Sequence, residues 1–230
     1  HRCTNFGWGV FSVKEKVIEM TGVGRVRISN DANIAALGEM WKGGGRGHDS
    51  IVMVTLGTGV GGGIIQKGRV LMGSSGAGGE IGHIKVEFDH PASCGCGNSG
   101  CVEQYASATG VVRMAKESME PDSVLAQKAE TLTAKDVFDA AKAGDTYGCK
   151  VVDRFGRYLG IALSNVAQVV DPEAFVIGGG VSAAGQIILD SVEKYYNEYS
   201  MFALKNKEFH LAELGNDAGI YGAVRMVMFQ

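Results

Sequence analysis

The stretch Ser50-Ile-Val-Met-Val-Thr-Leu-Gly-Thr-Gly-Val-Gly-Gly-Gly63 decides the fold class of this chain. Its first six residues are almost continuously apolar, which predicts a strand buried on both faces. A second strand is predicted at 64–67, so the glycines between the two strands form the turn of a hairpin. Backbone N–H groups without side chains can approach a polyanion closely, and Thr58 adds a hydroxyl donor. The sequence therefore predicts a phosphate-binding turn, with a plain tight hairpin as the alternative.

The rest of the chain alternates between short apolar strands and longer helical patterns. Further strands are predicted at 24–29, 84–88, 174–177 and 209–212. Helices are predicted at 32–41, 103–119, 133–143, 147–170 and 183–200, with a closing helix at the C-terminal end. Because strand, glycine turn and helix recur in this order, the sequence predicts an α/β fold with ligands at the strand ends.

A second glycine loop ends the strand predicted at 174–177, in the string Val176-Ile-Gly-Gly-Gly-Val-Ser182. A flat ring such as adenine could lie against this backbone, although close helix–strand packing would also require small residues. The sequence lacks the lysine of a Walker loop and the strand–helix context of a GxGxxG loop, which disfavours the two common nucleotide-binding folds. The predicted nucleotide-binding residues of both loops are Gly57, Thr58, Gly59, Gly61, Gly62, Gly178, Gly179 and Gly180.

Composition narrows the possible partners. The 230 residues include 22 basic and 25 acidic side chains spread along the chain, with a net charge of -3. No basic face is available for a phosphate backbone, so nucleic acid is not expected as a partner. The sequence has no apolar run of membrane-spanning length, and no signal-peptide core follows the first residues. We therefore expect a soluble, cytoplasmic protein without a membrane partner.

One imidazole and three thiols cluster in the order H-x10-C-x-C-x4-C. They belong to His83, Cys94, Cys96 and Cys101. Three thiolates and a neutral imidazole match a closed, tetrahedral zinc site of the structural kind. A disulfide is the alternative, but it would leave one of the three clustered cysteines unpaired. Cys3 and Cys149 lie far off in the sequence and are expected to stay reduced.

Polar residues that could bind a sugar occur near this cluster and near the predicted helix at 32–41. They are Asn30, Asp31, Glu80, His83 and Glu103. A sugar needs several donors and acceptors around its ring hydroxyls, and phosphoryl transfer to a sugar needs one carboxylate that takes a proton from the attacking hydroxyl. Each carboxylate alone could equally be a solvated surface group, and Asp31 could merely cap its helix.

Six strings together resemble the ROK (repressor, open reading frame, kinase) family, and they span almost the whole chain in order. They are Asn30-Asp-Ala-Asn33, Leu56-Gly-Thr-Gly-Val-Gly-Gly-Gly63, Gly79-Glu-Ile-Gly-His83, Cys94-Gly-Cys-Gly-Asn-Ser-Gly-Cys-Val-Glu-Gln-Tyr-Ala-Ser107, Ile177-Gly-Gly-Gly-Val181 and Leu214-Gly-Asn-Asp-Ala-Gly219. The cysteine string joined to the Gly-His string is highly specific. The glycine loops alone would be shared with other members of the sugar kinase, Hsp70 and actin superfamily.

The resemblance implies an actin-like ATPase (ribonuclease H-like) fold, in which two lobes close on a cleft that binds a hexose and ATP with Mg²⁺. It implies that Asp31 is the general base for the 6-hydroxyl of the sugar, and that Asn30, Glu80, His83 and Glu103 bind the sugar. His83 would then hold zinc through one nitrogen and a sugar hydroxyl through the other, with the metal fixing the orientation of the ring. The implied reaction is ATP-dependent phosphorylation of a hexose.

One motif of the family is missing from this sequence. The N-terminal Asp-x-Gly-Gly-Thr loop, which contacts phosphate and magnesium, has no counterpart, and the resemblance begins at the stretch Asn5 to Trp8. We expect 1–34 to be the remnant of a truncated small N-terminal lobe, 35–217 to form the large lobe, and 218–230 to return to the small lobe. These 230 residues alone are expected to bind sugar weakly and to turn over poorly.

Two other functional classes stay open. A ROK transcription repressor would share the cysteine cluster but would carry a DNA-binding module before the present start, and a general base such as Asp31 has no evident use in it. A zinc-bearing interaction module would leave the glycine loops and carboxylates unexplained. Among kinases, the string Glu103-Gln-Tyr-Ala-Ser107 looks most like the glucokinase subgroup, with fructose, N-acetylmannosamine and N-acetylglucosamine as alternative hexoses. The resemblance also suggests a homodimer.

Overall fold

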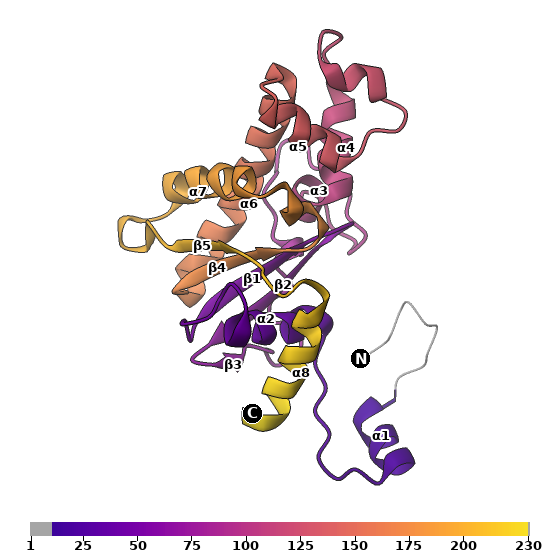
Figure 1. The fold of residues 1–230 in the computed structure, drawn as a ribbon, viewed down its shortest axis with the longest axis vertical. Coiled ribbons are helices and arrows are strands. Elements are labelled where there is room, and N and C mark those ends of the chain that lie inside the picture. Colours follow the sequence, from indigo (N-terminus) through magenta and orange to yellow (C-terminus); the bar gives the residue numbers. More distant parts are fainter. Residues whose placement is uncertain (1–10, 230) are drawn as a thin grey trace.

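A computed structural model describes residues 11–229 (Figure 1). The predictions for Cys3 and for Asn5 to Trp8 lie outside these residues. The described chain forms a five-stranded sheet with helices on both faces, which confirms the α/β prediction. None of the helices between residues 11 and 229 is both long enough and apolar enough to cross a bilayer.

The sheet mixes parallel and antiparallel pairs. Its strands are β1 (Ile51–Leu56), β2 (Val60–Gln66), β3 (Arg69–Val70), β4 (Ala174–Gly178) and β5 (Glu208–Leu211). They lie in the order β3-β2-β1-β4-β5, with β1 antiparallel to β2 and parallel to β4, and with β5 parallel to β4. Since β1, β4 and β5 run in parallel, their carboxyl ends lie at one edge of the sheet, where α/β proteins bind ligands.

Helices cover both faces of the sheet, which explains why β1 is continuously apolar. The covering helices are α2 (Asp31–Lys42), α6 (Thr146–Val170), α7 (Gln186–Tyr199) and α8 (Ala218–Phe229). Val52 and Val54 belong to the larger core with α6 and α7, whereas Ile51 and Met53 belong to a second core with α2 and α8. Figure 1 shows these two helix pairs on opposite sides of the sheet.

The C-terminal helix α8 packs closely along α2. Glycines make this approach possible, because a methyl group at Gly38 would come within 2.1 Å of the carbonyl oxygen of Ala218. A methyl group at Gly222 would come within 1.7 Å of the carbonyl oxygen of Ile34. α8 thereby closes the core on one face of the sheet.

The remaining elements are shorter. The other helices are α1 (Val13–Thr21), α3 (Glu103–Ala106), α4 (Ala108–Glu117) and α5 (Ala134–Lys142). Short 3-10 turns are η1 (Ile81–His83), η2 (Val124–Lys128), η3 (Gly180–Ala184), η4 (Phe202–Leu204) and η5 (Gly215–Asp217). No residue of α1 is buried, and an extended segment connects this helix to α2 (Figure 1).

Two predicted strands are wrong. Residues 25–30 have no regular secondary structure, and 84–88 contribute only one isolated bridge, between Lys85 and Cys101. A strand needs backbone partners on a neighbouring strand, which a short apolar run cannot reveal. Around Lys85 the backbone bonds close the cysteine loop instead, since the N–H of Val86 donates to the carbonyl oxygen of Gly100.

The helix predicted at 103–119 is broken at Ser107. The backbone of Ser107 is extended (φ −84°, ψ 167°), and its side chain caps the first turn of α4. Because the chain breaks here, the N–H of Ala108 donates to the carbonyl oxygen of Gly57 at 2.8 Å. The interruption therefore docks the N-terminus of α4 on the glycine turn between β1 and β2.

A capping box at the start of α5 makes one contribution to stability depend on pH. The Asp136 carboxylate accepts hydrogen bonds from the backbone N–H and hydroxyl of Thr133, at 3.0 and 2.5 Å, and from Lys128 at 2.6 Å. The Lys128 ammonium and then the Thr133 donors lower the pKa of Asp136 to about 2. A carboxyl group with a lowered folded-state pKa stabilises the fold above its unfolded pKa, about 4, and this contribution is lost as the pH falls through about 2.

We expect Asp136→Asn to lower the free energy of unfolding at neutral pH by about 1 kcal/mol, because a neutral amide accepts the Lys128 ammonium and the N–H of Thr133 more weakly than a carboxylate does. The variant should also lose less stability than the unsubstituted protein between about pH 4 and about pH 2. Urea denaturation at a series of pH values measures both effects. Asp122→Asn, at an exposed position outside the helix, is the control. If the free energy of unfolding fell equally with pH in Asp136→Asn and in the unsubstituted protein, Asp136 would not be the source of this pH dependence.

Candidate active site

A polar cavity of about 870 Å³ opens at the carboxyl ends of the parallel strands. Three carboxylates far apart in the sequence, those of Asp31, Glu80 and Glu103, line this cavity together. The glycine turn forms another wall, and the loop after β5 contributes Gly215 and Asn216. The predicted strand-end position of the ligand site thus coincides with a real cavity.

A second, mostly apolar cavity of about 400 Å³ adjoins the first. Gly57 and Thr58 line both cavities, so the glycine turn separates them. Residues of η3 and α5, including Val181 and Phe138, form the apolar walls, and Asp139 adds a carboxylate. An apolar slot with a few polar groups beside a polar cavity suits a planar ring attached to a charged group.

Six of the eight predicted nucleotide-binding residues line a cavity, and two do not. Gly57 and Thr58 line both cavities, Gly59, Gly61 and Gly179 line the polar one, and Gly180 lines the apolar one. By contrast, Gly62 and Gly178 lie buried within β2 and β4 and line neither cavity. The turn is shorter than expected because β2 already begins at Val60.

Packing explains the two buried glycines. A methyl group at Gly62 would come within 2.5 Å of the carbonyl oxygen of Gly79, and one at Gly178 within 2.9 Å of the Ala212 side chain. Their lack of a side chain therefore serves close contact between neighbouring segments.

Contacts from three directions hold the glycine turn in place. The N–H of Val60 donates to Oε2 of Glu103 at 3.1 Å, and the hydroxyl of Thr109 donates to the carbonyl oxygen of Thr58. The third contact is the bond from Ala108 to Gly57. A methyl group at Gly59 would come within 2.3 Å of the Glu103 carboxylate, so this glycine is needed for the carboxylate to reach the turn.

Asn30 and Asp31 share the start of α2 but have different roles. The Asn30 side chain caps the helix by accepting the N–H of Asn33 at 2.8 Å. Asp31 is exposed to the cavity, and its Oδ1 accepts the N–H of Ala32 at 2.9 Å. Within the described chain only this one oxygen of Asp31 has a hydrogen-bond partner, so Oδ2 can accept a bond or a proton from a ligand.

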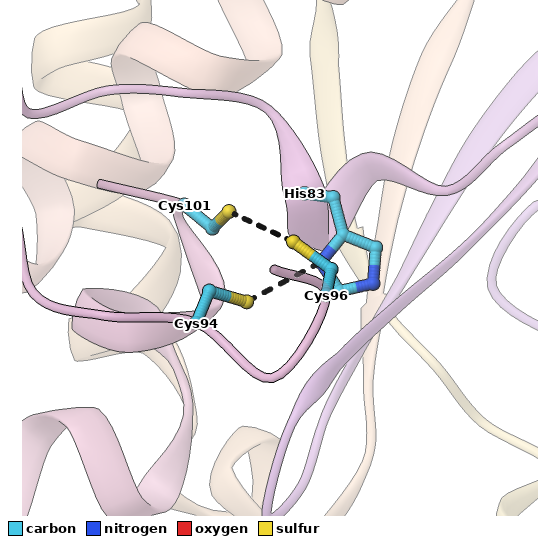
Figure 2. A group of neighbouring side chains, drawn as sticks. All are labelled: His83, Cys94, Cys96 and Cys101. Carbon is cyan, nitrogen blue, oxygen red and sulfur yellow. Dashed lines mark hydrogen bonds between the residues drawn. The ribbon is translucent and has the colours of Figure 1, made fainter. Parts of the chain in front are cut away.

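The predicted metal ligands come together in space (Figure 2). The donor atoms of His83, Cys94, Cys96 and Cys101 all lie within 4.8 Å of one another. Nδ1 of His83 is 3.6 Å from Sγ of Cys94, and the Cys96 and Cys101 sulfurs are 3.7 Å apart. Tetrahedral zinc requires donor separations of about 3.4–3.8 Å, so these residues fit the ion.

The protonation behaviour of the thiols also fits a cation. Burial first, and then the hydrogen bonds and charge repulsion of the neighbouring Cys94 and Cys96 sulfurs, raise the pKa of the Cys101 thiol to about 12. By contrast, a backbone hydrogen bond from Asn98 and a bond with Cys94 lower the pKa of the exposed Cys96 thiol. A divalent cation would remove the repulsion between three thiolates in this space.

The cluster connects to the polar cavity through Glu103, whereas the predicted sugar-binding residues Asn30 and His83 are not among the residues that line it. Oε1 of Glu103 lies 3.9 Å from Sγ of Cys94, while Oε2 holds the glycine turn. His83 is exposed, and Figure 2 shows its second ring nitrogen on the side away from the sulfur atoms. Within residues 11–229 that nitrogen has no hydrogen-bond partner, so it can meet a ligand.

Aromatic residues that the sequence analysis missed support the cysteine loop from behind. The hydroxyl of Tyr158 on α6 donates to Oε2 of Glu87 at 2.8 Å, and the N–H of Ala92 donates to the hydroxyl of Tyr105 at 2.9 Å. The two tyrosine rings stack with centroids 4.2 Å apart. The bond from Tyr158, followed by the N–H of Asp89, lowers the pKa of Glu87.

Glu39 is a second residue that the sequence analysis missed. Its side chain is fully buried in α2, and its carboxylate accepts three backbone N–H groups. Oε2 binds those of Gly44 and Glu213, at 2.8 and 3.0 Å, and Oε1 binds that of Leu214 at 2.9 Å. Glu39 therefore fixes the loop that leads directly to Gly215 at the cavity.

We expect Glu39→Gln to lower the free energy of unfolding by about 2–3 kcal/mol, because the amide NH₂ cannot accept the backbone N–H groups that would face it. Limited proteolysis should cut the loop around Leu214 faster in this variant. Glu213→Gln, an exposed carboxylate in the same loop, is the matched control and should leave both properties unchanged. Equal stability of the two variants would contradict this role of Glu39.

The sheet and its paired cavities define an α/β protein with an apolar cavity beside a polar one at the carboxyl ends of its parallel strands. The chain belongs to the ROK family, whose profile matches residues 1–229. It is 47% identical to the glucokinase of Halalkalibacterium halodurans, in a match covering the whole of this chain and 71% of that protein. The xylose repressor of Bacillus subtilis is 30% identical, with 97% of this chain and 56% of the repressor covered.

Solved structures agree with this assignment. The crystal structure of a ROK family glucokinase from Streptomyces griseus, in complex with glucose and AMPPNP, matches with a TM-score of 0.79 and 37% identity. That match covers 93% of this chain and 71% of the solved chain. ROK sugar kinases have the actin-like ATPase fold, so the predicted fold is confirmed.

Proposed function

We propose that this protein is an ATP-dependent glucokinase that transfers the γ-phosphate of ATP to the 6-hydroxyl of glucose. The observation that carries the proposal is that Asp31, Glu80 and Glu103 line one polar cavity with the glycine turn. The identity to glucokinases supports glucose as the sugar and ATP as the donor. Glycolysis in the cytoplasm is the proposed setting.

The two cavities suggest how the substrates divide. The nucleoside of MgATP would occupy the apolar cavity between η3 and α5, with its phosphates crossing Gly57, Thr58 and Gly59. Backbone N–H groups at such a turn stabilise phosphate charge. The sugar would occupy the polar cavity on the other side of the turn. This arrangement brings the phosphate chain to the boundary between donor and acceptor, as in-line transfer requires.

Each polar residue has a proposed role toward the sugar. Asp31 would accept the proton of the attacking 6-hydroxyl through its unpartnered Oδ2, while Asn30, Glu80, His83 and Glu103 would hold the other hydroxyls. Bidentate carboxylates suit neighbouring hydroxyls on a pyranose ring because both groups of a diol can donate to one carboxylate.

The cysteine cluster is proposed to hold a structural zinc ion. His83, Cys94, Cys96 and Cys101 would hold it as a closed set without an open position. When bound, zinc supplies a fixed orientation for the His83 ring and an anchor for the segment that ends at Glu103. The chemistry of phosphoryl transfer would rest on the residues of the cavity.

A ROK repressor is the second candidate, supported by the likeness to the xylose repressor. An exposed carboxylate at the cavity with one free oxygen favours the kinase, because a sugar sensor has no evident need for a base there.

Three further features of the protein are proposed. It forms a homodimer, it has no nucleic acid partner, and its chain divides into a small-lobe remnant at 1–34, a large lobe at 35–217 and a C-terminal helix at 218–230 that returns to the small lobe.

A coupled assay on the full-length gene product tests the proposal. Glucose, fructose, N-acetylmannosamine and N-acetylglucosamine are compared as acceptors with ATP as the donor. We expect glucose to have the highest kcat/KM. Sugar binding without turnover, together with retention on DNA, would favour the repressor, and a higher kcat/KM for another hexose would reassign the substrate.

A further inference from the structure

A second group of metal-binding side chains lies at the edge strand β5, outside the residues that line the two cavities. Glu208 and His210 alternate along β5, so both side chains stand on the same face of the strand. His48 reaches them from the loop between α2 and β1. The three ligand atoms lie within 4.8 Å of one another.

The distances place both imidazoles around a single carboxylate oxygen. Nε2 of His210 is 2.9 Å from Oε2 of Glu208, and Nε2 of His48 is 3.5 Å from the same oxygen. The two imidazole centroids are 5.7 Å apart. Tetrahedral or octahedral coordination by nitrogen and oxygen at about 2.0–2.2 Å needs donors about 2.9–3.5 Å apart, so small side-chain movements suffice.

Both imidazoles turn Nε2 toward the same carboxylate oxygen. A neutral imidazole can donate an N–H from this nitrogen or, in the other tautomer, present a lone pair there. In the second tautomer all three groups act as electron-pair donors, and a divalent cation can accept from all of them at once.

The backbone holds the three groups in place before any ligand binds. Oε2 of Glu173 accepts the N–H groups of Asp49 and Ser50, at 2.7 and 2.8 Å, which fixes the loop just after His48. These two bonds lower the pKa of Glu173, so it adds a negative charge near His48. Pairing with β4 fixes the positions of Glu208 and His210.

Exposure leaves the group accessible to an ion from solution. The side chains of His48, His210 and Glu208 are 20%, 35% and 62% exposed. The set is two imidazoles and one carboxylate, which suits first-row divalent ions and leaves coordination positions for water.

We propose that His48, Glu208 and His210 form a second metal site, which binds one first-row divalent cation such as Zn²⁺, Co²⁺ or Ni²⁺. The ion ties the loop after α2 to the edge strand of the sheet. This site is independent of the cysteine cluster and of the proposed kinase reaction.

Cobalt titration distinguishes the two sites, because thiolate ligands give strong charge-transfer absorption and nitrogen–oxygen ligands do not. The experiment uses the full-length gene product, stripped of metal, reduced, and without a polyhistidine tag. We expect a first equivalent of Co²⁺ that develops the thiolate band. A second equivalent should then bind without increasing that band, as measured by calorimetry.

Substitutions identify the residues that bind the second equivalent of Co²⁺. His48→Gln, His210→Gln and Glu208→Gln should each weaken the second step by more than about tenfold while retaining the thiolate band, which also shows that the variants fold. His90→Gln, at an exposed histidine outside the group, is the matched control and should retain both steps. Binding of one equivalent only, or a second equivalent that survives both histidine substitutions, would overturn the proposal.

Discussion

Replacing Asp31 by asparagine should lower kcat for glucose phosphorylation by about 100- to 10,000-fold, the usual contribution of a general base. The amide cannot take the proton of the attacking hydroxyl. Its shape is unchanged, and its oxygen can still accept the N–H of Ala32, which Asp31 binds at 2.9 Å. The helix should remain intact because Asn30 supplies the cap. We therefore expect the KM for glucose and the melting temperature to change little.

Steady-state kinetics of the full-length gene product, with glucose binding followed by calorimetry, measures this effect. Asp122→Asn removes an exposed carboxylate elsewhere and should leave kcat unchanged. If Asp31 were only a favourable charge in the first turn of α2, its substitution would lower stability by a few tenths of a kcal/mol and leave kcat intact. That result would remove the general base from the proposed mechanism.

Much of the sheet and its helices could be predicted because their signals are local. The apolar run at 50–55 predicts β1 whatever its partners are, since a strand buried on both faces has no alternation to detect. The helices at 147–170 and 183–200 are long enough for their periodicity to be clear, and the structure confirms them to within three residues. Asp171 and Pro172 end α6 where predicted.

The wrong elements depend on contacts that no local pattern contains. The run at 24–29 has strand-forming residues but no ladder within the described chain. The helix after Cys101 breaks at Ser107, where the N–H of Ala108 bonds to the carbonyl oxygen of Gly57, in a turn about 50 residues earlier. The helix α1 was missed although Ser12 and Gly22 cap it, because its apolar residues are not buried and produce little periodicity.

In the candidate site too, residues close in sequence could be predicted and residues that meet only in the fold could not. The cysteine cluster could be predicted because its four ligands lie within 19 positions of one another and zinc chemistry requires specific donors. Glu39 could not be predicted as a positioning residue, because two of its three partners are the backbone N–H groups of Glu213 and Leu214, more than 170 positions away. His48 and His210 are also far apart in the sequence, by 162 positions, and meet only because β5 joins the edge of the sheet.

Glu103 connects the proposed metal site with the proposed phosphate turn. One of its oxygens lies near Cys94, and the other holds the N–H of Val60. A disturbance of the cysteine loop would therefore reach both the sugar cavity and the glycine turn. The proposed metal ion would thus support ligand binding while contributing no catalytic group of its own.

Loss of the metal should consequently impair both stability and sugar binding. We expect Cys101→Ser to release the zinc, to lower the free energy of unfolding by at least about 4 kcal/mol, and to raise the KM for glucose by at least about tenfold. Cys101 is only 1% exposed, so the serine hydroxyl would be left as a poor ligand in an apolar space. Hydrogen exchange should show faster exchange at 83–103 while β1 and β4 stay protected.

A control variant and a chelator test whether these effects come from loss of the metal. Cys149→Ser alters an exposed thiol whose sulfur contacts only the carbonyl oxygen of Ala141 at 3.5 Å within the described chain, and it should change none of these properties. A chelator that removes zinc from the unsubstituted protein should reproduce the Cys101→Ser phenotype, and added Zn²⁺ should reverse it only in the protein with Cys101. The contrary outcome is a metal-free protein with an unchanged melting temperature and an unchanged KM for glucose. It would show that the positions of His83 and Glu103 do not depend on the ion, and that the four ligands do not support the sugar site.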